Sequence, residues 1–124
     1  ALNYAAGVGT PANIRTLLAA GADIGARDKH GSTPLHFAAS IGIPANIQAL
    51  LAAGADIKAL NKEGSTALRY AASSPFPRPG VIQALLSAGA DAKAKNKYGK
   101  TPWDYAQEND KLKGYWALND AQYD

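Results

Sequence analysis

The sequence of 124 residues contains neither cysteine nor methionine, and its aromatic residues are few. Without cysteine the chain can form no disulfide and offers no thiolate ligand to a metal ion. Because aromatic residues make up only 8% of the chain, we expect no single deep core built from large side chains. No apolar run approaches the roughly 18–20 residues that span a bilayer. The sequence therefore predicts no insertion into a membrane.

The absence of methionine extends to position 1, which is alanine. We therefore expect translation to start before Ala1, with a removed leader and a longer parent protein as the two alternatives. We see no pattern typical of a secretory signal, so the compartment stays open, with the cytoplasm preferred to export. The formal net charge of +3 is too small by itself to indicate a nucleic-acid-binding protein.

The sequence contains two patterns that each occur three times. Three segments share one pattern: ANIRTLLAAGADI at 12–24, ANIQALLAAGADI at 45–57 and GVIQALLSAGADA at 80–92. A second pattern also occurs three times: GSTPLHFAA at 31–39, GSTALRYAA at 64–72 and GKTPWDYA at 99–106. The GAD triplets are separated by 33 and 35 residues, and self-similarity at such a period indicates a repeat architecture.

Each repeat is predicted to begin with a short helix. Thr33 precedes Pro34, which suits a helix start because the hydroxyl can cap free N–H groups and proline fits the first helical position. Leu35, Ala38 and Ala39 then lie on one face at helical spacing. This apolar face is the candidate for packing against a neighbouring repeat.

A second helix is predicted from about Pro44 to Ala53. Gly54 follows it as a residue suited to the left-handed conformation just past a helix end. Residues 56–66 lack a helical period and contain the turn-forming stretch NKEG. Each repeat should therefore consist of a helix, a tight turn, a second helix and an extended, hairpin-like arm.

Helices of two or three turns are only marginally stable alone. Each unit can bury its apolar edges only against the next unit, so the units must stack. Alanines at positions 38, 39, 71 and 72 would let the stacked helices approach closely. The predicted fold class is α, an all-helical repeat solenoid of stacked helix–turn–helix units with hairpin-like arms.

These patterns resemble those of the ankyrin-repeat family. The family pattern G-x-T-P-L-H-x-A-A, followed by a glycine, a Leu-Leu pair and G-A-D, is present at residues 31–56, and the resemblance covers essentially the whole chain. It implies a noncatalytic protein–protein interaction module, which we expect to be monomeric. The expected organisation is one domain, 1–124, divided into a partial repeat at about 1–30, repeats at 31–63 and 64–98, and a C-terminal cap at 99–124.

Two regions depart from the family pattern. The stretch SSPFPRPG at 73–80 contains two extra residues, and its prolines and glycine predict a loop between the helices of that repeat. This loop is either tolerated surface variation or a contact surface that presents Phe76 and Arg78. In the last unit, four large side chains are expected to cover the end of the stack: Trp103, Tyr105, Tyr115 and Trp116.

No arrangement of side chains predicts catalysis, a metal site or a cofactor. His36 occupies the family's T-P-L-H position, where the resemblance implies hydrogen bonds to threonine and backbone groups that lock adjacent units. Asp23, Asp56 and Asp91 recur after Gly-Ala, so we expect them to accept hydrogen bonds from loop N–H groups rather than to form a catalytic pair. His30 is expected at an arm tip, in solvent. The chain is predicted not to be an enzyme.

The resemblance implies a concave face, formed by the arm tips and the first helices, that binds another protein. The candidate contact residues there are Lys29, His30, Ser32, Ser40, Lys62, Glu63, Ser65, Arg69, Ser73, Lys97, Tyr98 and Lys100, besides Phe76 and Arg78 of the loop. The stretch KAKNKYGK at 93–100 places four lysines around a tyrosine. We therefore expect a partner with an acidic surface and Tyr98 as an aromatic anchor.

Three alternatives stay open. In the first, the lysines only keep the exposed arms soluble and prevent edge pairing. In the second, the basic stripe binds a nucleic acid or another polyanion, although the arms carry few aromatic side chains for base stacking. In the third, the chain is a scaffold segment of a larger multidomain protein whose activity lies elsewhere.

Overall fold

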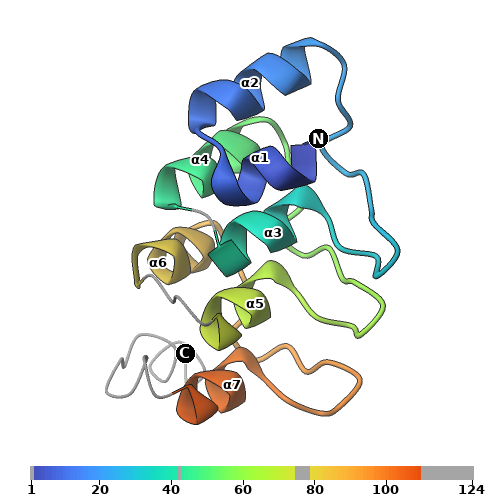
Figure 1. The fold of residues 1–124 in the computed structure, drawn as a ribbon. Helices are drawn as coiled ribbons and strands as arrows, with labels where there is room; N and C mark the ends of the chain where they lie inside the picture. The colour runs from blue at the N-terminus through green and yellow to red at the C-terminus, as the bar shows by residue number, and fades with distance from the viewer. Residues whose placement is uncertain (1, 42, 75–78, 110–124) are drawn as a thin grey trace.

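The computed structural model describes residues 2–41, 43–74 and 79–109 of the chain. Within these ranges the regular secondary structure is helical, without a β-strand. The helices are α1 (Leu2–Val8), α2 (Pro11–Ala19), α3 (Pro34–Ile41), α4 (Pro44–Ala52), α5 (Ala67–Ser73), α6 (Pro79–Ser87) and α7 (Pro102–Glu108). Arms at 20–33, 53–66 and 88–101 connect successive helix pairs (Figure 1).

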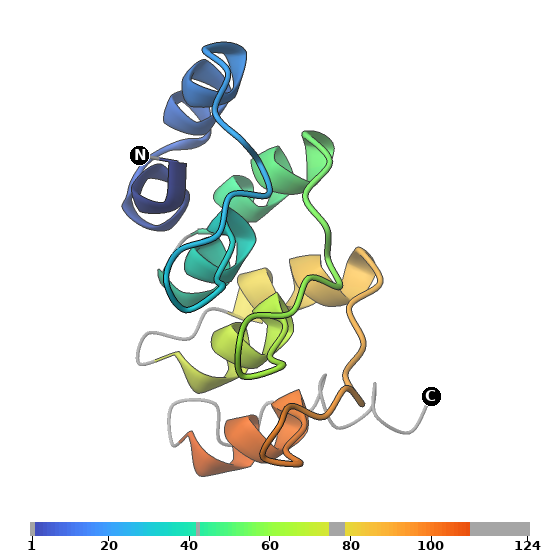
Figure 2. The same cartoon turned by 90° about the vertical axis from the view of Figure 1, so that its right-hand side faces the viewer.

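The helix pairs stack one upon another. Figure 1 shows α1, α3, α5 and α7 in one column and α2, α4 and α6 in a second column, with all the arms projecting from the same side. In Figure 2 the arms lie in front of both columns. The predicted all-helical repeat solenoid is thus confirmed, and the second helix predicted at 44–53 ends at Ala52.

One continuous apolar core runs through the stack. Its fully buried members come from both columns and include Leu35 and Leu68 of the first helices and Ile47, Leu50 and Ile82 of the second helices. Helices of successive repeats contact one another in both columns, in addition to the contacts within each pair. Packing therefore joins each repeat to its neighbours, as the short helices require.

The first helices approach one another closely. The four alanines at positions 38, 39, 71 and 72 are all buried, as predicted. At the boundary between α1 and α3, a Cβ atom added to Gly7 would lie only 2.7 Å from the side chain of Ile41. Small residues in this column therefore set the distance between repeats.

The turn after each second helix is also built as predicted. Gly54 has a φ of +96°, and the corresponding glycines of the other two turns have almost the same value. The aspartates that follow, Asp23, Asp56 and Asp91, each accept a hydrogen bond at 2.9 Å from the backbone N–H two residues further on. These carboxylates hold their own loops and do not converge on a common cleft.

The loop predicted at 73–80 is shorter than expected. Helix α5 extends to Ser73, and α6 begins at Pro79, so Ser73, Pro79 and Gly80 belong to helices. The prediction of a loop at these three positions was wrong. Proline is disfavoured inside a helix but suits its first position, where the missing N–H has no helical partner, so Pro79 can begin α6.

Some predicted features lie outside the described residues. Phe76 and Arg78 of the loop are among them, and so are Tyr115 and Trp116 of the predicted cap. The two aromatic residues of α7, Trp103 and Tyr105, are described, and both pack half-buried against the core.

Candidate protein-binding face

The arm tips are shaped by one side-chain amide or carboxylate in each arm. Asn61 Oδ1 accepts hydrogen bonds from the N–H groups of Glu63 and Ser65, both at 3.0 Å, and the Asn61 N–H donates to Ser65 O at 3.1 Å. Asp28 and Asn96 make the same set of bonds in the other two arms. The three tips therefore share one rigid, hairpin-like conformation.

Backbone hydrogen bonds join each arm tip to the next. The N–H of Lys62 donates to His30 O at 3.0 Å, and the N–H of Lys97 donates to Glu63 O at 2.9 Å. Gly31 permits this approach, since its φ is +75° and an added Cβ would lie 3.1 Å from the Lys62 nitrogen. We call the arm tips and the exposed sides of the first helices the inner face (Figures 1 and 2).

One cation of the arms, Arg27, is used within the fold. Arg27 Nη1 donates to Gly31 O at 2.9 Å and to Leu60 O at 2.6 Å, and Leu60 belongs to the following arm. The guanidinium therefore ties two arms together. Lys29, Lys62 and Lys97 remain exposed at the tips.

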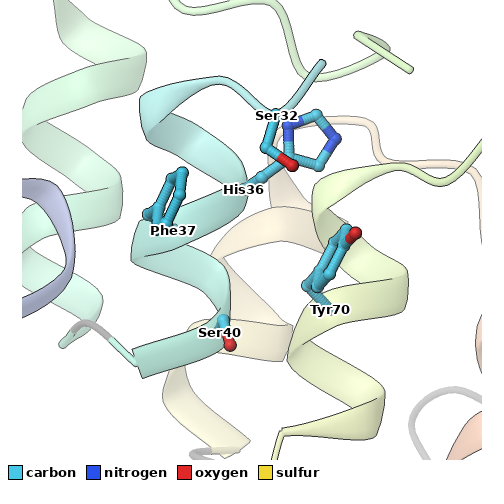
Figure 3. Close-up of a pocket in the computed structure, with 5 residues that line it drawn as sticks. All are labelled: Ser32, His36, Phe37, Ser40 and Tyr70. Atoms are coloured by element: carbon cyan, nitrogen blue, oxygen red, sulfur yellow. The ribbon is translucent and has the colours of Figure 1, made fainter. Parts of the chain in front are cut away.

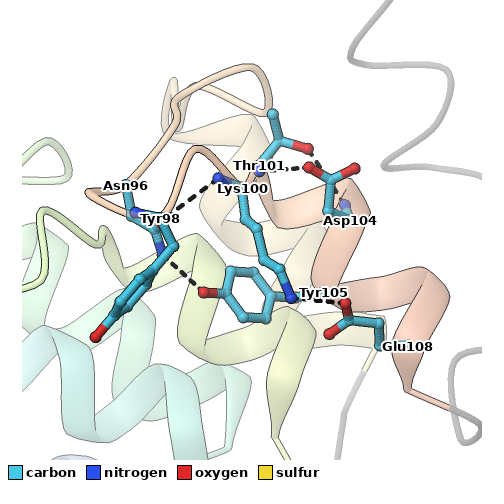
Figure 4. Close-up of polar contacts among 7 residues, drawn as sticks. All are labelled: Asn96, Tyr98, Lys100, Thr101, Asp104, Tyr105 and Glu108. Atoms are coloured by element: carbon cyan, nitrogen blue, oxygen red, sulfur yellow. Dashed lines mark hydrogen bonds and ion pairs between the residues drawn. The ribbon is translucent and has the colours of Figure 1, made fainter.

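In two of the three arms, the tip is held by a tyrosine of the first helix that follows. Asn96 Nδ2 donates to Tyr105 Oη at 2.7 Å (Figure 4), and Asn61 Nδ2 donates to Tyr70 Oη. The corresponding residues of the remaining arm and its following helix are Asp28 and Phe37, which can make no such bond because a carboxylate is no donor and phenylalanine has no hydroxyl. Sequence reasoning missed this pairing of asparagine with a tyrosine nine residues later.

We predict that Tyr105→Phe lowers the free energy of unfolding by about 0.5–1.5 kcal/mol, because it removes the Asn96 bond and keeps the ring. Tyr98→Phe is the matched control. It makes the same change at a tyrosine that is 57% exposed, whose hydroxyl has no hydrogen bond to another described residue, so stability should stay nearly unchanged. Urea unfolding of both variants checks this, and equal losses of stability in the two variants would argue against the pairing.

His36 links two repeats from a buried position, with 2% of its surface exposed. Its Nδ1 accepts a hydrogen bond from the Thr33 N–H at 3.0 Å and contacts the Thr33 hydroxyl at 2.9 Å, while Nε2 lies 3.0 Å from Ser65 O. The ring is therefore the neutral tautomer with its proton on Nε2, donated to Ser65 O. The predicted structural role of His36 is confirmed.

The cap predicted at Thr33 differs from the structure. The Thr33 hydroxyl bonds the His36 ring, whereas Thr10 and Thr101 each accept a hydrogen bond from the third residue of their helix. The imidazole Nδ1 three residues later thus accepts from both the N–H and the hydroxyl of Thr33. Where that position holds Asp104 instead, the side chain completes a capping box with Thr101.

Burial lowers the pKa of the His36 imidazole below its ordinary value, and the charge of Arg27 adds to this effect, although the hydrogen bond to Ser65 opposes it. At pH values between the lowered pKa and the ordinary pKa, His36 therefore binds a proton in the unfolded chain but not in the folded chain. The His36 contribution to stability should be complete above about pH 6.5 and should decline as the pH falls toward the lowered pKa, by at most about 1.4 kcal/mol per pH unit.

Urea unfolding at pH 7.5 and pH 5.0 tests this prediction, with His36→Gln as the control. The amide of glutamine can still donate toward Ser65 O but does not titrate. The difference in stability between the two pH values should shrink in His36→Gln. An equal difference in both proteins would show that other groups cause the pH dependence.

Arg69 replaces the corresponding histidine in repeat three. Its guanidinium carbon lies 4.7 Å from the ring centre of Tyr70 and 4.3 Å from that of Tyr105. Two aromatic faces therefore hold the cation on the inner face by cation–π attraction. Its Nε is buried without a hydrogen-bond partner among the described residues.

The structure brings most of the predicted contact residues to the inner face, with different exposure. Five are exposed: Lys29, His30, Lys62, Lys97 and Tyr98. Five are half-buried: Ser40, Glu63, Arg69, Ser73 and Lys100. Ser32 and Ser65 are buried, and Ser65 has only 1% of its surface exposed.

Tyr98 and Lys100 differ in how much of each side chain is available. Tyr98 at the last arm tip is 57% exposed, with Lys97 Nζ 5.2 Å from its ring centre. Lys100 Nζ is paired with Glu108 Oε1 at 2.7 Å, and this hydrogen bond raises the pKa of the lysine (Figure 4). Tyr98 and Lys97 are therefore the more accessible pair.

A pocket of about 90 Å³ opens on the inner face between α3 and α5. Phe37 and Tyr70 flank it on opposite sides, and the side chains of Ser32, His36 and Ser40 complete the lining (Figure 3). The sequence predicted the two serines as contact residues but missed the two aromatic walls. The signal was available, since Phe37, Tyr70 and Tyr105 occupy the same position in successive repeats.

Within the described ranges, no group of three or more histidine or acidic side chains could hold a metal ion. No helix in these ranges is long and apolar enough to cross a membrane. The inner face thus presents cations, serine hydroxyls and aromatic rings on a rigid scaffold.

Comparison with known families gives one clear match. A family model described as ankyrin repeats, in three copies, matches residues 2–96. A search of curated proteins finds no match. Ankyrin repeats are generally noncatalytic modules for protein–protein interaction. The matched residues include the stacked helix pairs, the glycines that follow the second helices and the single T-P-L-H motif whose His36 bonds the next repeat, and the chain belongs to the ankyrin-repeat family.

Proposed function

We propose that this chain is a noncatalytic module that binds a partner protein on its inner face. The observation that carries the proposal is Tyr98, which is 57% exposed at the tip of the last arm and lies beside Lys97. The hydrogen bond from its backbone N–H to Asn96 Oδ1 fixes the tip at 2.9 Å. A large aromatic side chain on a rigid loop suits an interface anchor, because little conformational entropy is lost on binding.

The charges of the inner face favour a partner with an acidic surface. Lys29, Lys62 and Lys97 are exposed on successive arm tips. Such a row raises the rate of encounter with an acidic protein more than it raises the final affinity. Buried Ser65 is left out of the proposed contact set, because its hydroxyl faces Asn96 Nδ2 at 3.3 Å.

We further propose that residues 1–124 act as one monomeric domain with the four units given above. The continuity of the core across the described repeats supports a single domain. The proposed cap at 99–124 rests on the sequence for its second half, since only 99–109 are described.

The experiment is affinity capture of partners by the full chain, compared with a Lys97→Ala/Tyr98→Ala double variant. We expect the variant to weaken binding of the captured partner by about 30-fold or more, as for a hot-spot aromatic residue. The matched control changes three exposed residues of the second helices, Arg15, Gln48 and Gln83, to alanine and should bind normally. Binding lost in the control but kept in the double variant would place the interface elsewhere.

The salt dependence of binding distinguishes protein binding from the second candidate function, which is polyanion binding through the basic arms. A protein partner should bind with a moderate loss of affinity between 50 and 200 mM salt. A nucleic acid bound through 6–10 phosphates would lose roughly 10³–10⁵-fold over that range. The exposed lysines favour this candidate, whereas Tyr98 is the one large aromatic side chain exposed among the described arm residues, which is too few for a base-stacking surface.

A further inference from the structure

The pocket between α3 and α5 has a counterpart one repeat further along. Its lining residues are Ser32, His36, Phe37, Ser40 and Tyr70. The residues at the same positions of the next repeat boundary, between α5 and α7, are Ser65, Arg69, Tyr70, Ser73 and Tyr105. Both sites therefore have two aromatic residues on neighbouring first helices, with serines at the same two positions.

The two sites differ in what fills them. At the second site the guanidinium of Arg69 lies against both rings, with its central carbon 4.7 Å and 4.3 Å from the centres of Tyr70 and Tyr105. At the first site the corresponding residue is His36, which is shorter, bonds inward to Thr33 and to Ser65 O, and packs at a right angle to the Tyr70 ring with 5.5 Å between ring centres. The imidazole lines the pocket without filling it, and about 90 Å³ stays open.

The charge at the open site favours a cation. Tyr70 Oη donates to Glu63 Oε1 at 3.2 Å, which places a carboxylate at the rim of the aromatic wall. Ser32 and Ser40 add hydroxyl oxygens to the lining. The second site instead has Lys100 Nζ 5.3 Å from the ring centre of Tyr105, in addition to Arg69. The chain's own cations therefore occupy the second site and leave the first unfilled.

We propose that the pocket between α3 and α5 binds an arginine side chain of the partner, with its guanidinium between Phe37 and Tyr70 and near Glu63. Arg69 at the next repeat boundary is the chain's own example of this arrangement. The inference rests on the proposed partner binding and refines it: the partner segment carries one arginine for this pocket among acidic residues for the exposed lysines.

The test is an NMR titration of the full chain with the blocked peptide acetyl-Gly-Ser-Arg-Ser-Gly-amide. We expect saturable shifts of the backbone amides of Ser32, Phe37, Ser40 and Tyr70. A peptide with norleucine in place of arginine has a similar apolar stem without charge, and it should bind at least about 10-fold more weakly. Equal shifts with both peptides, shifts spread over all acidic residues, or no saturable shift would each overturn the proposal.

Variants of the pocket walls sharpen the test. Phe37→Leu should weaken arginine-peptide binding by about 2-fold to 30-fold, the range of one cation–π contact, whereas Phe37→Tyr should keep the affinity. Glu63→Gln should also weaken binding. Equal affinity of Phe37→Leu and Phe37→Tyr would rule out stacking on this wall, and their amide spectra and melting temperatures check that both variants fold.

Emptying the second site gives an independent result. The double change Arg69→Ala/Lys100→Ala removes both cations from the rings of Tyr70 and Tyr105, so the arginine peptide should gain a second site with shifts at Ser73 and Tyr105. Failure to gain that site would overturn the comparison between the two boundaries. Partner capture distinguishes the two proposals. If the Phe37→Leu protein still captures the partner and the parent chain does not bind the arginine peptide, the arginine pocket is overturned and the proposed function stands.

Discussion

Leu50→Ala is expected to lower the free energy of unfolding by about 2–5 kcal/mol, the usual cost of removing three carbons from a closed core. Leu50 lies in α4 with none of its surface exposed, within the core cluster that runs through the stack. The change leaves a cavity that short helices on both sides can fill only by moving against their own neighbours. Urea unfolding followed by circular dichroism measures the loss.

Leu60→Ala is the matched control, because it makes the same chemical change on an arm. Leu60 is 50% exposed, so its loss should cost less than about 0.5 kcal/mol. If both variants lost similar stability, burial between repeats would not be the main source of the stability of the fold.

The second large effect is expected for Asn46→Ala, at about 2–3 kcal/mol. Asn46 Nδ2 donates to Ala6 O and to Gly9 O, both at 3.1 Å, so one buried amide from the second repeat satisfies two carbonyls of the first. Alanine leaves the buried carbonyl of Ala6 and the partly buried carbonyl of Gly9 without this donor. The loss is reduced in part because Asn46 Oδ1 has no hydrogen-bond partner in the described structure.

Asn13→Ala provides the comparison within the same local sequence, A-N-I. Among the described residues, the exposed Asn13 side chain bonds only the Thr10 N–H, which it accepts at 3.1 Å within its own helix cap. Its replacement should cost less than about 1 kcal/mol. Thermal unfolding of the two variants side by side tests the difference, and equal losses would contradict a bridging role for Asn46.

The contrast between Asn13 and Asn46 marks the limit of sequence reasoning for this chain. The period of the repeats, the helix pairs, the glycine turns and the loop-binding aspartates all follow from local patterns, and the structure has them. Two asparagines in the same P-A-N-I sequence nevertheless have different partners. Asn13 forms a capping box with Thr10, whereas Asn46, with Ile43 at the cap position, donates to carbonyls across the repeat boundary. The exchange of threonine for isoleucine is visible in the sequence, but the acceptor carbonyls in the neighbouring repeat are not.

The candidate site was likewise predictable from the sequence only in part. Positions relative to the repeat placed Lys62, Lys97 and Tyr98 on the arm tips correctly. The same reasoning expected Ser65 to face a partner, but it is buried because the adjoining arm covers it. The pocket between Phe37 and Tyr70 depends on two rings from different repeats and on the inward turn of His36, which only three-dimensional packing reveals.

No repeat is stable without its neighbours, so a change that destabilises one repeat must also destabilise the others. A Trp116→Phe background leaves Trp103 of α7 as the sole tryptophan and thus as a reporter of the fourth repeat. The decisive measurement is the urea midpoint reported by Trp103 fluorescence with and without Leu50→Ala in the second repeat. We predict that Leu50→Ala lowers the Trp103 midpoint together with the urea midpoint of the whole chain. An unchanged Trp103 midpoint would mean that the repeats fold independently.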